Sequence, residues 1–253
     1  MNSIEKINKY QMDIYAEYEK NTSQKLIETY DHILKLYKTN DNIKILDIGG
    51  GSGYFSKNLK KYFHANNCEI IVIDSTRYDT WDENFYEIKF METSAERLTE
   101  IFEKNTFDII FANRVFHHLV KPTWKQSIDN ISAIIGKINE ILKDNGYFCI
   151  TDYFYDGRFN HTFASRVIYT LTSCKNPILI AVFKKIEAKS AGVGVCFLSR
   201  KMWLHLFSKY NLNLYYSNEG HVLARKKIKL LVYKIVLFIK NCQEDIVMIL
   251  TKK

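Results

Sequence analysis

The sequence predicts an α/β protein with a mostly parallel sheet and helices on both of its faces. Segments of strand length alternate with segments whose apolar residues recur at helical spacing, which is typical of such a sheet. The run IIVI at residues 70–73 is apolar throughout, as expected of a parallel strand buried on both faces. A glycine-rich turn at residues 49–53 separates one strand directly from the next helix.

Each element has a local signal. Apolar runs of four to eight residues indicate strands, and apolar residues three and four positions apart indicate helices. Thr22 or Ser23 is expected to cap the helix that begins near Leu26, and Pro122 and Thr123 precede the clearest helix. The expected strands are 43–48, 70–73, 85–91, 107–112, 147–151, 212–216 and 246–250. The expected helices cover 4–18, 26–37, 55–63, 95–102, 128–142, 199–207 and 222–240.

The composition is that of an ordinary globular protein, with 47% apolar and 25% charged residues. We find neither the apolar region of a signal peptide nor an apolar run of about 18 residues that could span a membrane. The cysteines are widely spaced and form no C-x-x-C pair, which argues against structural zinc and for reduced thiols. We therefore expect a cytoplasmic protein without a metal. The net charge of +8 would attract anionic partners through long-range steering.

The glycine turn carries the main functional signal. Residues 47–53 read DIGGGSG, after a strand and before a helix. Glycine lets the chain turn sharply and lets a ligand approach the backbone, where a Cβ would block it. The helix that follows presents unpaired amides at the positive end of its dipole. The pattern alone is compatible with a dinucleotide, a phosphate or only a tight turn.

Details around the turn narrow these alternatives. The Walker pattern requires Lys and then Ser or Thr after the last glycine, but Tyr54 follows Gly53. The dinucleotide pattern G-x-G-x-x-G would also need a glycine at position 54. Instead, Asp47 precedes the first glycine and Asp74 ends the next strand. A carboxylate at that strand end suits two hydrogen bonds to ribose hydroxyls.

With these residues, the sequence resembles the class I S-adenosylmethionine-dependent methyltransferase family, in particular its ubiquinone- and menaquinone-biosynthesis-like branch. ILDIGGGSG at 45–53 is similar to motif I, and VFHHL at 115–119 is similar to the L-H-H-L segment. The resemblance covers about residues 43–216 and the final strand. It implies a Rossmann-like seven-stranded sheet whose antiparallel last strand inserts beside strand five. An NAD-type Rossmann dehydrogenase, the alternative fold, lacks that strand.

The resemblance also implies S-adenosylmethionine as cofactor and methyl donor. TSAERL at 93–98 resembles the turn beside the adenine, where many members carry Asp and this chain carries Ser94. A hydroxyl is the weaker acceptor, so donor affinity would be lower, or Glu92 or Glu96 would take over the role. The cofactor-binding residues implied are Asp47, Gly49, Gly51, Gly53, Asp74, Ser94, Ala95 and Asn113.

His117 is the candidate catalytic residue. An imidazole with a pKa near neutrality can take a proton from a hydroxyl or amine acceptor. His118 is adjacent, so at most one of the two faces a pocket, and the alternative is that the pair only packs at a helix start. Asp152 and Tyr153 end strand five, where ligands gather in open α/β sheets, but we interpret them as packing or surface residues.

We expect a single methyltransferase domain over residues 1–253, because no Pro- or Gly-rich linker divides the chain. The regular alternation breaks after Asp152, where a helical lid or insertion is expected. The expected parts are N-terminal helices at 1–40, the donor-binding half at 41–152, the lid at 153–194 and the C-terminal part of the sheet at 195–253.

The predicted function is methyl transfer to an oxygen, carbon or nitrogen of a small, even lipid-like, molecule. The basic segment 222–240 is either a core helix whose lysines reach water or a helix in peripheral membrane contact. A nucleic-acid or protein methyltransferase is the alternative that the net charge favours. However, NRVF stands at 113–116 where base-amino enzymes carry Asn/Asp-Pro-Pro-aromatic, so no stable nucleic-acid partner is expected. A non-catalytic donor-binding protein is the second alternative.

Overall fold

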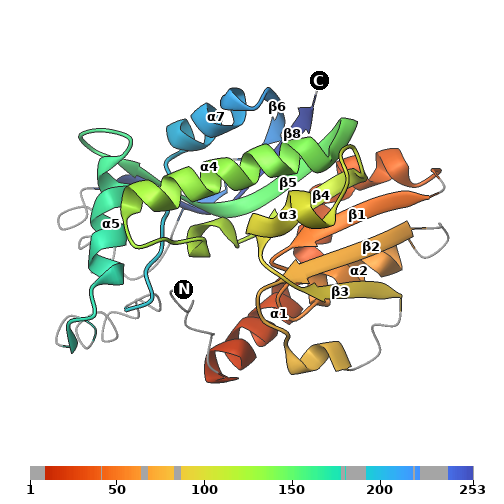
Figure 1. Ribbon diagram of the computed structural model, residues 1–253, viewed down its shortest axis with the longest axis horizontal. Helices are drawn as coiled ribbons and strands as arrows, with labels where there is room; N and C mark the ends of the chain where they lie inside the picture. The colour runs from red at the N-terminus through yellow and green to blue at the C-terminus, as the bar shows by residue number, and fades with distance from the viewer. Residues whose placement is uncertain are drawn as a thin grey trace. The chain divides into compact units, whose positions relative to one another are not determined.

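The computed structural model describes residues 9–40, 42–63, 68–82, 87–177, 180, 192–218, 220–222 and 239–252 (Figure 1). The strands follow the order β3-β2-β1-β4-β5-β8-β6, and the two-residue strand β7 pairs with β8. The strands are β1 Ile43–Ile48, β2 Cys68–Asp74, β3 Ile88–Glu92, β4 Phe107–Asn113, β5 Leu142–Gly157, β6 Leu212–Ser217, β7 His221–Val222 and β8 Ile239–Lys252.

The pairing confirms the predicted fold class. β1 pairs in parallel with both β2 and β4, and β2 pairs in parallel with β3. The last strand, β8, stands between β5 and β6 and runs antiparallel to β6. This is the insertion beside strand five that separates the predicted fold from the NAD-type alternative.

Along the chain, α1 precedes the first strand, and the other described helices lie between strands (Figure 1). They are α1 Lys9–Leu34, α2 Tyr54–Tyr62, α3 Leu98–Ile101, α4 Trp124–Ile141, α5 Phe163–Ser173 and α7 Arg200–Lys209. Single 3-10 turns include η2 Asp79–Asp82, η3 Ala95–Arg97 and η4 Phe116–His118. Among the described residues, no helix has the length and apolar character needed to cross a membrane.

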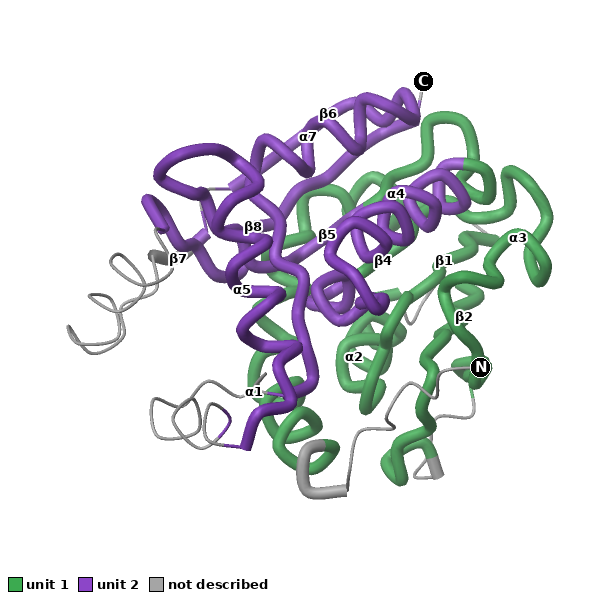
Figure 2. The backbone as a smooth tube through the Cα atoms, turned by 60° about the vertical axis from the view of Figure 1, so that its left-hand side comes forward, with its two compact units in different colours: residues 1–112, 140–148 green, residues 113–139, 149–253 purple. Residues whose placement is uncertain are grey.

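The chain divides into two compact units, which Figure 2 colours separately. Unit 1 comprises residues 1–112 and 140–148, and unit 2 comprises residues 113–139 and 149–253. In unit 1, α1 packs on α2, and the rings of Tyr30 and Phe55 each lie about 5 Å from that of Phe111, at 5.0 and 5.1 Å. In unit 2, the buried Trp203 ring contacts Phe116 and Phe207.

The N-terminal prediction was wrong in one respect. We expected two helices with a cap at Thr22 or Ser23, but α1 runs without interruption from Lys9 to Leu34. Both hydroxyls lie inside the helix and donate back to carbonyls, Thr22 to that of Tyr18 and Ser23 to that of Lys20. Ser23 is fully buried and accepts a hydrogen bond from Asn58 of α2 at 2.9 Å. Tertiary packing therefore continues the helix through residues whose intrinsic preference is for caps.

The later boundaries also differ from the prediction. β5 extends through Gly157, so the sheet continues five residues into the segment 153–157 that was expected to begin a lid. Its helical part is present as α5. The basic helix expected at 222–240 falls mostly on residues 223–238, which lie outside the described residues. At its two ends the chain is strand, in β7 and at the start of β8.

Candidate functional site

The glycine turn joins β1 to α2 in unit 1. Gly49, Gly51 and Gly53 have φ angles of 70°, 49° and 81°, in the left-handed region that a Cβ disfavours. The amide of Gly49 donates to the carbonyl of Ile73 in β2 at 2.7 Å, and the amide of Gly53 donates to the carbonyl of Gly50 at 2.9 Å. The turn therefore needs glycine at the three positions that the sequence motif indicates.

Gly50, the remaining glycine of residues 49–53, is required by close packing and not by its φ angle. A Cβ at this position would lie 2.3 Å from Cγ1 of Val72 and 3.0 Å from Oδ2 of Asp47. The turn thus rests directly on β2. The carbonyls of the turn are held as well, because Trp81 Nε1 donates to Gly51 at 2.8 Å and Thr80 Oγ1 donates to Ser52 at 2.9 Å.

Asp74 lies at the carboxyl end of β2, beside the turn. Its Oδ2 accepts a hydrogen bond from the amide of Gly51 at 3.0 Å, and its Oδ1 accepts one from the amide of Thr76 at 3.0 Å. Burial raises the pKa of Asp74, and these backbone hydrogen bonds act in the opposite direction. A carboxylate has about four sites that accept hydrogen bonds, so the group can accept from a hydroxyl in addition to its backbone donors.

Asp47 supports the turn from within the core. Its side chain is only 1% exposed, and its Oδ2 accepts a hydrogen bond from Ser56 Oγ of α2 at 2.6 Å. Burial raises the pKa of Asp47, the hydrogen bond from Ser56 opposes the rise, and the nearby carboxylates of Glu19 and Asp74 add to it, so that the pKa is about 7. Asp47 therefore ties β1 to α2 beneath the turn.

The raised pKa of Asp47 predicts how stability responds to pH in the absence of ligand. The folded protein holds the carboxyl neutral until about pH 7, whereas the unfolded chain ionises it near its ordinary value of 3.8. The contribution of Asp47 is therefore complete below pH 4 and is lost as pH rises towards 7, by at most about 1.4 kcal/mol per pH unit. Urea unfolding of the wild type and Asp47→Asn between pH 4.5 and 8 should show the two stabilities converging or crossing. Parallel curves would contradict this expectation.

Ser94 and Ala95 begin the turn that follows β3. Ser94 Oγ accepts a hydrogen bond from the amide of Glu96 at 3.2 Å and so caps η3, while Ala95 is buried. The amide of Thr93 donates to the carbonyl of Asp74 at 2.8 Å, which holds this turn against the end of β2. Seven of the nine site residues inferred from the sequence thus gather in unit 1, at the carboxyl ends of β1, β2 and β3. They are Asp47, Gly49, Gly51, Gly53, Asp74, Ser94 and Ala95.

One residue at the turn was not foreseen. Glu19, in the middle of α1, directs its carboxylate at the start of α2. Its Oε2 accepts hydrogen bonds from the amide of Ser52 at 2.9 Å and from its hydroxyl, and its Oε1 accepts one from the amide of Phe55 at 3.0 Å. No local sequence signal marks this acid, because the contact joins residues 33 to 36 positions apart.

The remaining two candidates, Asn113 and His117, belong to unit 2. Asn113 ends β4, and η4 begins three residues later. His117 is 6% exposed, and its Nδ1 lies 2.7 Å from Oδ1 of Asp152 at the end of the apolar part of β5. Asp152 Oδ1 also accepts from the amide of Tyr153 at 2.8 Å, which fixes the carboxylate. In the tautomer whose Nδ1–H donates to Asp152, the lone pair of the imidazole lies on Nε2.

Aromatic rings fix the plane of the imidazole. Phe197 stacks on His117 at 5.0 Å, and the ring of Tyr153 meets it edge-on at 5.3 Å. The ring of the adjacent His118 lies 4.0 Å from that of His117, so the two imidazoles pack against each other. Asp152 is therefore a candidate site residue that we set aside on sequence. Its position at a strand end was visible, but its partner, 35 residues away, was not.

The backbone before η4 is strained and held on both sides. Arg114 has a φ of 56°, and its amide donates to the carbonyl of Thr151 in β5 at 2.6 Å. Its guanidinium meets Oδ1 of Asp245 in β8 through Nε at 2.7 Å and Nη2 at 2.6 Å. A non-glycine residue in this region costs about 1–3 kcal/mol, so the ion pair and the strand contact stabilise the bend that orients η4.

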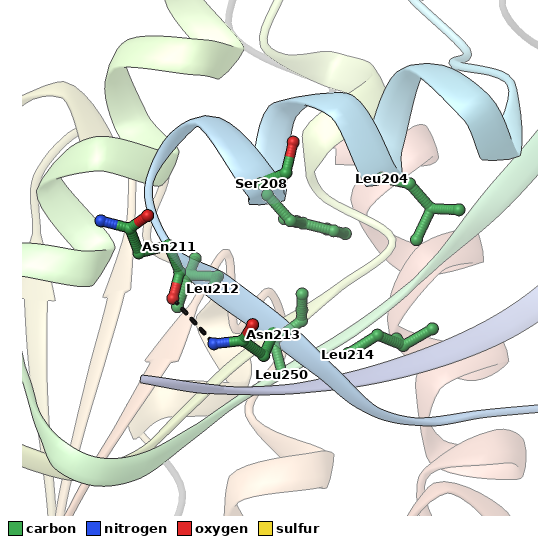
Figure 3. Close-up of a pocket in the computed structure, with 8 residues that line it drawn as sticks. Leu204, Ser208, Asn211, Leu212, Asn213, Leu214 and Leu250 are labelled. Atoms are coloured by element: carbon green, nitrogen blue, oxygen red, sulfur yellow. Dashed lines mark hydrogen bonds between the residues drawn. The ribbon is translucent and has the colours of Figure 1, made fainter. Parts of the chain in front are cut away.

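A pocket in unit 2 lies away from these residues. Figure 3 shows it between α7 and β6, with Leu204 and Leu214 on its apolar side and Asn213 donating to the carbonyl of Asn211 at 3.2 Å. It contains no titratable side chain and none of the candidate residues. In the part of the chain that the structure describes, no group of three or more His, Cys, Asp or Glu side chains could hold a metal ion.

Comparison with known families decides the class of protein. The model of a methyltransferase domain matches residues 18–217, which is most of the chain. The chain belongs to this methyltransferase family. The resemblance inferred from motif I and its neighbours is thereby confirmed, and the matched residues include all the candidate site residues and Glu19.

Two curated relatives of this methyltransferase are similar over part of their length. Phosphoethanolamine N-methyltransferase of Plasmodium falciparum is 27% identical over 131 residues, 50% of this chain and 45% of that protein. Malonyl-[acyl-carrier protein] O-methyltransferase of Bacillus anthracis is 28% identical over 126 residues, 47% of this chain and 42% of that protein. The matched region thus spans less than half the length of either relative.

Solved methyltransferase structures share the fold. A structure from Galdieria sulphuraria, described as a sarcosine dimethylglycine methyltransferase, superposes with a TM-score of 0.57 at 13% identity. The superposition covers 92% of this chain and 86% of that one. A SAM-dependent methyltransferase from Methanosarcina mazei has a TM-score of 0.56 at 17% identity, with 87% and 96% covered. At these identities the similarity establishes the fold and not the acceptor.

Proposed function

We propose that this methyltransferase binds S-adenosylmethionine at the glycine turn of unit 1 and methylates an oxygen or nitrogen of a small molecule. The observation that carries the donor site is the carboxylate of Asp74, held by the amide of Gly51 beside three left-handed glycines. Such a carboxylate at the end of the second strand suits a ribose.

The residues at the turn fit the donor in charge as well as in shape. Among the described residues, the side chains that hydrogen-bond to the turn include two carboxylates, Glu19 and Asp74, and the neutral Thr80 and Trp81. S-Adenosylmethionine carries a positive sulfonium, so an acidic surrounding favours the donor over its neutral thioether product.

The bound donor supplies a methyl group that is already activated for displacement by a nucleophile. The chain then has to position the acceptor, exclude water and remove a proton where the acceptor is a hydroxyl or ammonium. We assign the last task to Nε2 of His117. Asp152 holds Nδ1–H and stabilises the imidazolium that forms when Nε2 takes the proton.

The proposed acceptor class draws on the two curated relatives, which by name methylate a nitrogen of phosphoethanolamine and an oxygen of a malonyl group on acyl-carrier protein. In both names the methylated group is small and polar, although the malonyl group is carried on a protein. A lipid-like acceptor or a membrane contact through 222–240 has only the basic and apolar sequence of that segment in its favour.

Calorimetric titration with S-adenosylmethionine and S-adenosylhomocysteine tests the donor site, and mass spectrometry of product mixtures tests the acceptor. The acceptor panel would contain phosphoethanolamine, a malonyl thioester, free amino alcohols, a quinol and a short RNA. Saturable binding of both ligands and methylation of at least one small acceptor are expected. A folded protein that binds neither ligand would contradict the proposal, and methylation of RNA alone would replace its acceptor class.

A further inference from the structure

The amino end of α2 lacks a cap of its own. Its N-cap is Gly53, which has no side chain to accept a hydrogen bond, and its first turn contains no acid. The first amides of a helix have no partner within the helix and are normally satisfied by a nearby side chain or by a ligand. In this protein a side chain of α1 satisfies them, because the carboxylate of Glu19 accepts hydrogen bonds from the amides of Ser52 and Phe55.

The contact is one of three polar contacts between α1 and α2. Glu19 and Ser23 stand four positions apart and share one face of α1, and Asp31 follows eight positions later, beyond the buried Ile27. Their partners follow α2 in order: Glu19 meets Phe55, Ser23 meets Asn58 at 2.9 Å, and Asp31 meets Tyr62 at 2.8 Å. The register of α1 on α2 therefore delivers the carboxylate of Glu19 to the turn.

The turn is built around this carboxylate. A Cβ on Gly51 would lie 3.1 Å from Glu19 Oε2, so the glycine makes room for the acid in addition to adopting a positive φ. Ser52 is fully buried, and both its amide and its hydroxyl donate to Glu19. Three donors on two oxygens require a carboxylate, since an amide side chain offers only one accepting oxygen.

We propose that Glu19 is a positioning residue of the donor site, which holds Ser52 and the first turn of α2 in the conformation that binds the donor tightly. The inference rests on the proposed donor site. Glu19 and Asp74 hold the turn from two elements, Glu19 at Ser52 and Asp74 at Gly51. Without Glu19, Ser52 loses a buried acceptor for two groups, and the turn has to rearrange to satisfy them.

The test compares Glu19→Ala and Glu19→Gln with two controls on the same helix. Glu17→Ala removes an exposed acid, and Ser23→Ala removes another α1–α2 contact without touching the turn. For each protein we would measure the dissociation constant for S-adenosylhomocysteine, the thermal midpoint, and hydrogen exchange of the segment 47–56 without ligand.

We expect Glu19→Ala to weaken binding at least tenfold and Glu19→Gln to weaken it less, with faster exchange in 47–56 for both. Ser23→Ala should lower the thermal midpoint with an unchanged dissociation constant, and Glu17→Ala should change neither. Wild-type affinity in a folded Glu19→Ala variant, or an equal loss of affinity in Ser23→Ala, would overturn the inference. If the wild type itself binds no ligand, the proposed function fails, and wild-type exchange in Glu19→Ala would separately refute the positioning role.

Discussion

Replacement of Asp74 with alanine is expected to weaken binding of S-adenosylmethionine by about a hundredfold or more. Hydrogen bonds from ribose hydroxyls to a carboxylate contribute about 1.5–3 kcal/mol each, and every 1.4 kcal/mol is a factor of about ten in affinity. The amide of Gly51 would lose its acceptor as well, so the turn itself would be less well held. Calorimetric titration of the variant measures the loss directly.

Matched variants distinguish the lost ribose contact from a damaged fold. Asp74→Asn keeps an oxygen that can accept from the Gly51 amide, so a smaller loss of affinity is expected than for alanine. Glu103→Ala removes an exposed acid of the same unit and should leave the affinity unchanged. A folded Asp74→Ala protein with wild-type affinity would show that the donor does not use this carboxylate.

The second large effect is expected at His117. Removal of a positioned general base lowers the rate of a proton-dependent step by about 10²–10⁴-fold. We therefore expect His117→Gln to lower kcat by roughly that factor on a hydroxyl or ammonium acceptor, with an unchanged dissociation constant for S-adenosylhomocysteine. The glutamine fills most of the space of the buried imidazole, which limits the loss of stability. Steady-state kinetics together with a ligand titration separate these effects.

Two further variants check the assignment of the base. Asp152→Asn leaves an oxygen near Nδ1 but removes the charge that stabilises the imidazolium, so kcat should fall while the fold is retained. His118→Gln changes the exposed neighbour and should have the smaller effect. A His117→Gln protein that turns over at the wild-type rate would mean that the Asp152–His117 pair is structural.

The sequence was most informative where a local requirement is strong. The glycine turn follows from the motif alone, and Gly49, Gly51 and Gly53 adopt left-handed φ angles in which other residues are strained. The mostly apolar segments 43–48 and 107–112 located β1 and β4 to within one residue of their ends. Both signals lie within a few consecutive residues, so no knowledge of distant contacts was needed.

Predictions were less accurate for residues whose partners lie far away in the sequence. Thr22 and Ser23 resemble a helix start, yet Ser23 is buried inside α1 because Asn58 satisfies its hydroxyl. Asp152 was interpreted as a packing or surface residue, whereas its Oδ1 lies 2.7 Å from Nδ1 of His117. Glu19 gave no signal at all, since an acid in the polar part of a long helix is ordinarily solvated.

The sequence by itself determined the fold class, the family, the glycine turn and the two acids that flank it. These depend on backbone conformation and on short apolar runs, which are properties of consecutive residues. Only the tertiary structure decided which side chains complete the turn and hold the candidate base. Glu19 reaches Ser52 across 33 positions, and Asp152 reaches His117 across 35. Such pairs form only when packing brings separate elements together, and the periodicity of the sequence does not indicate which elements will meet.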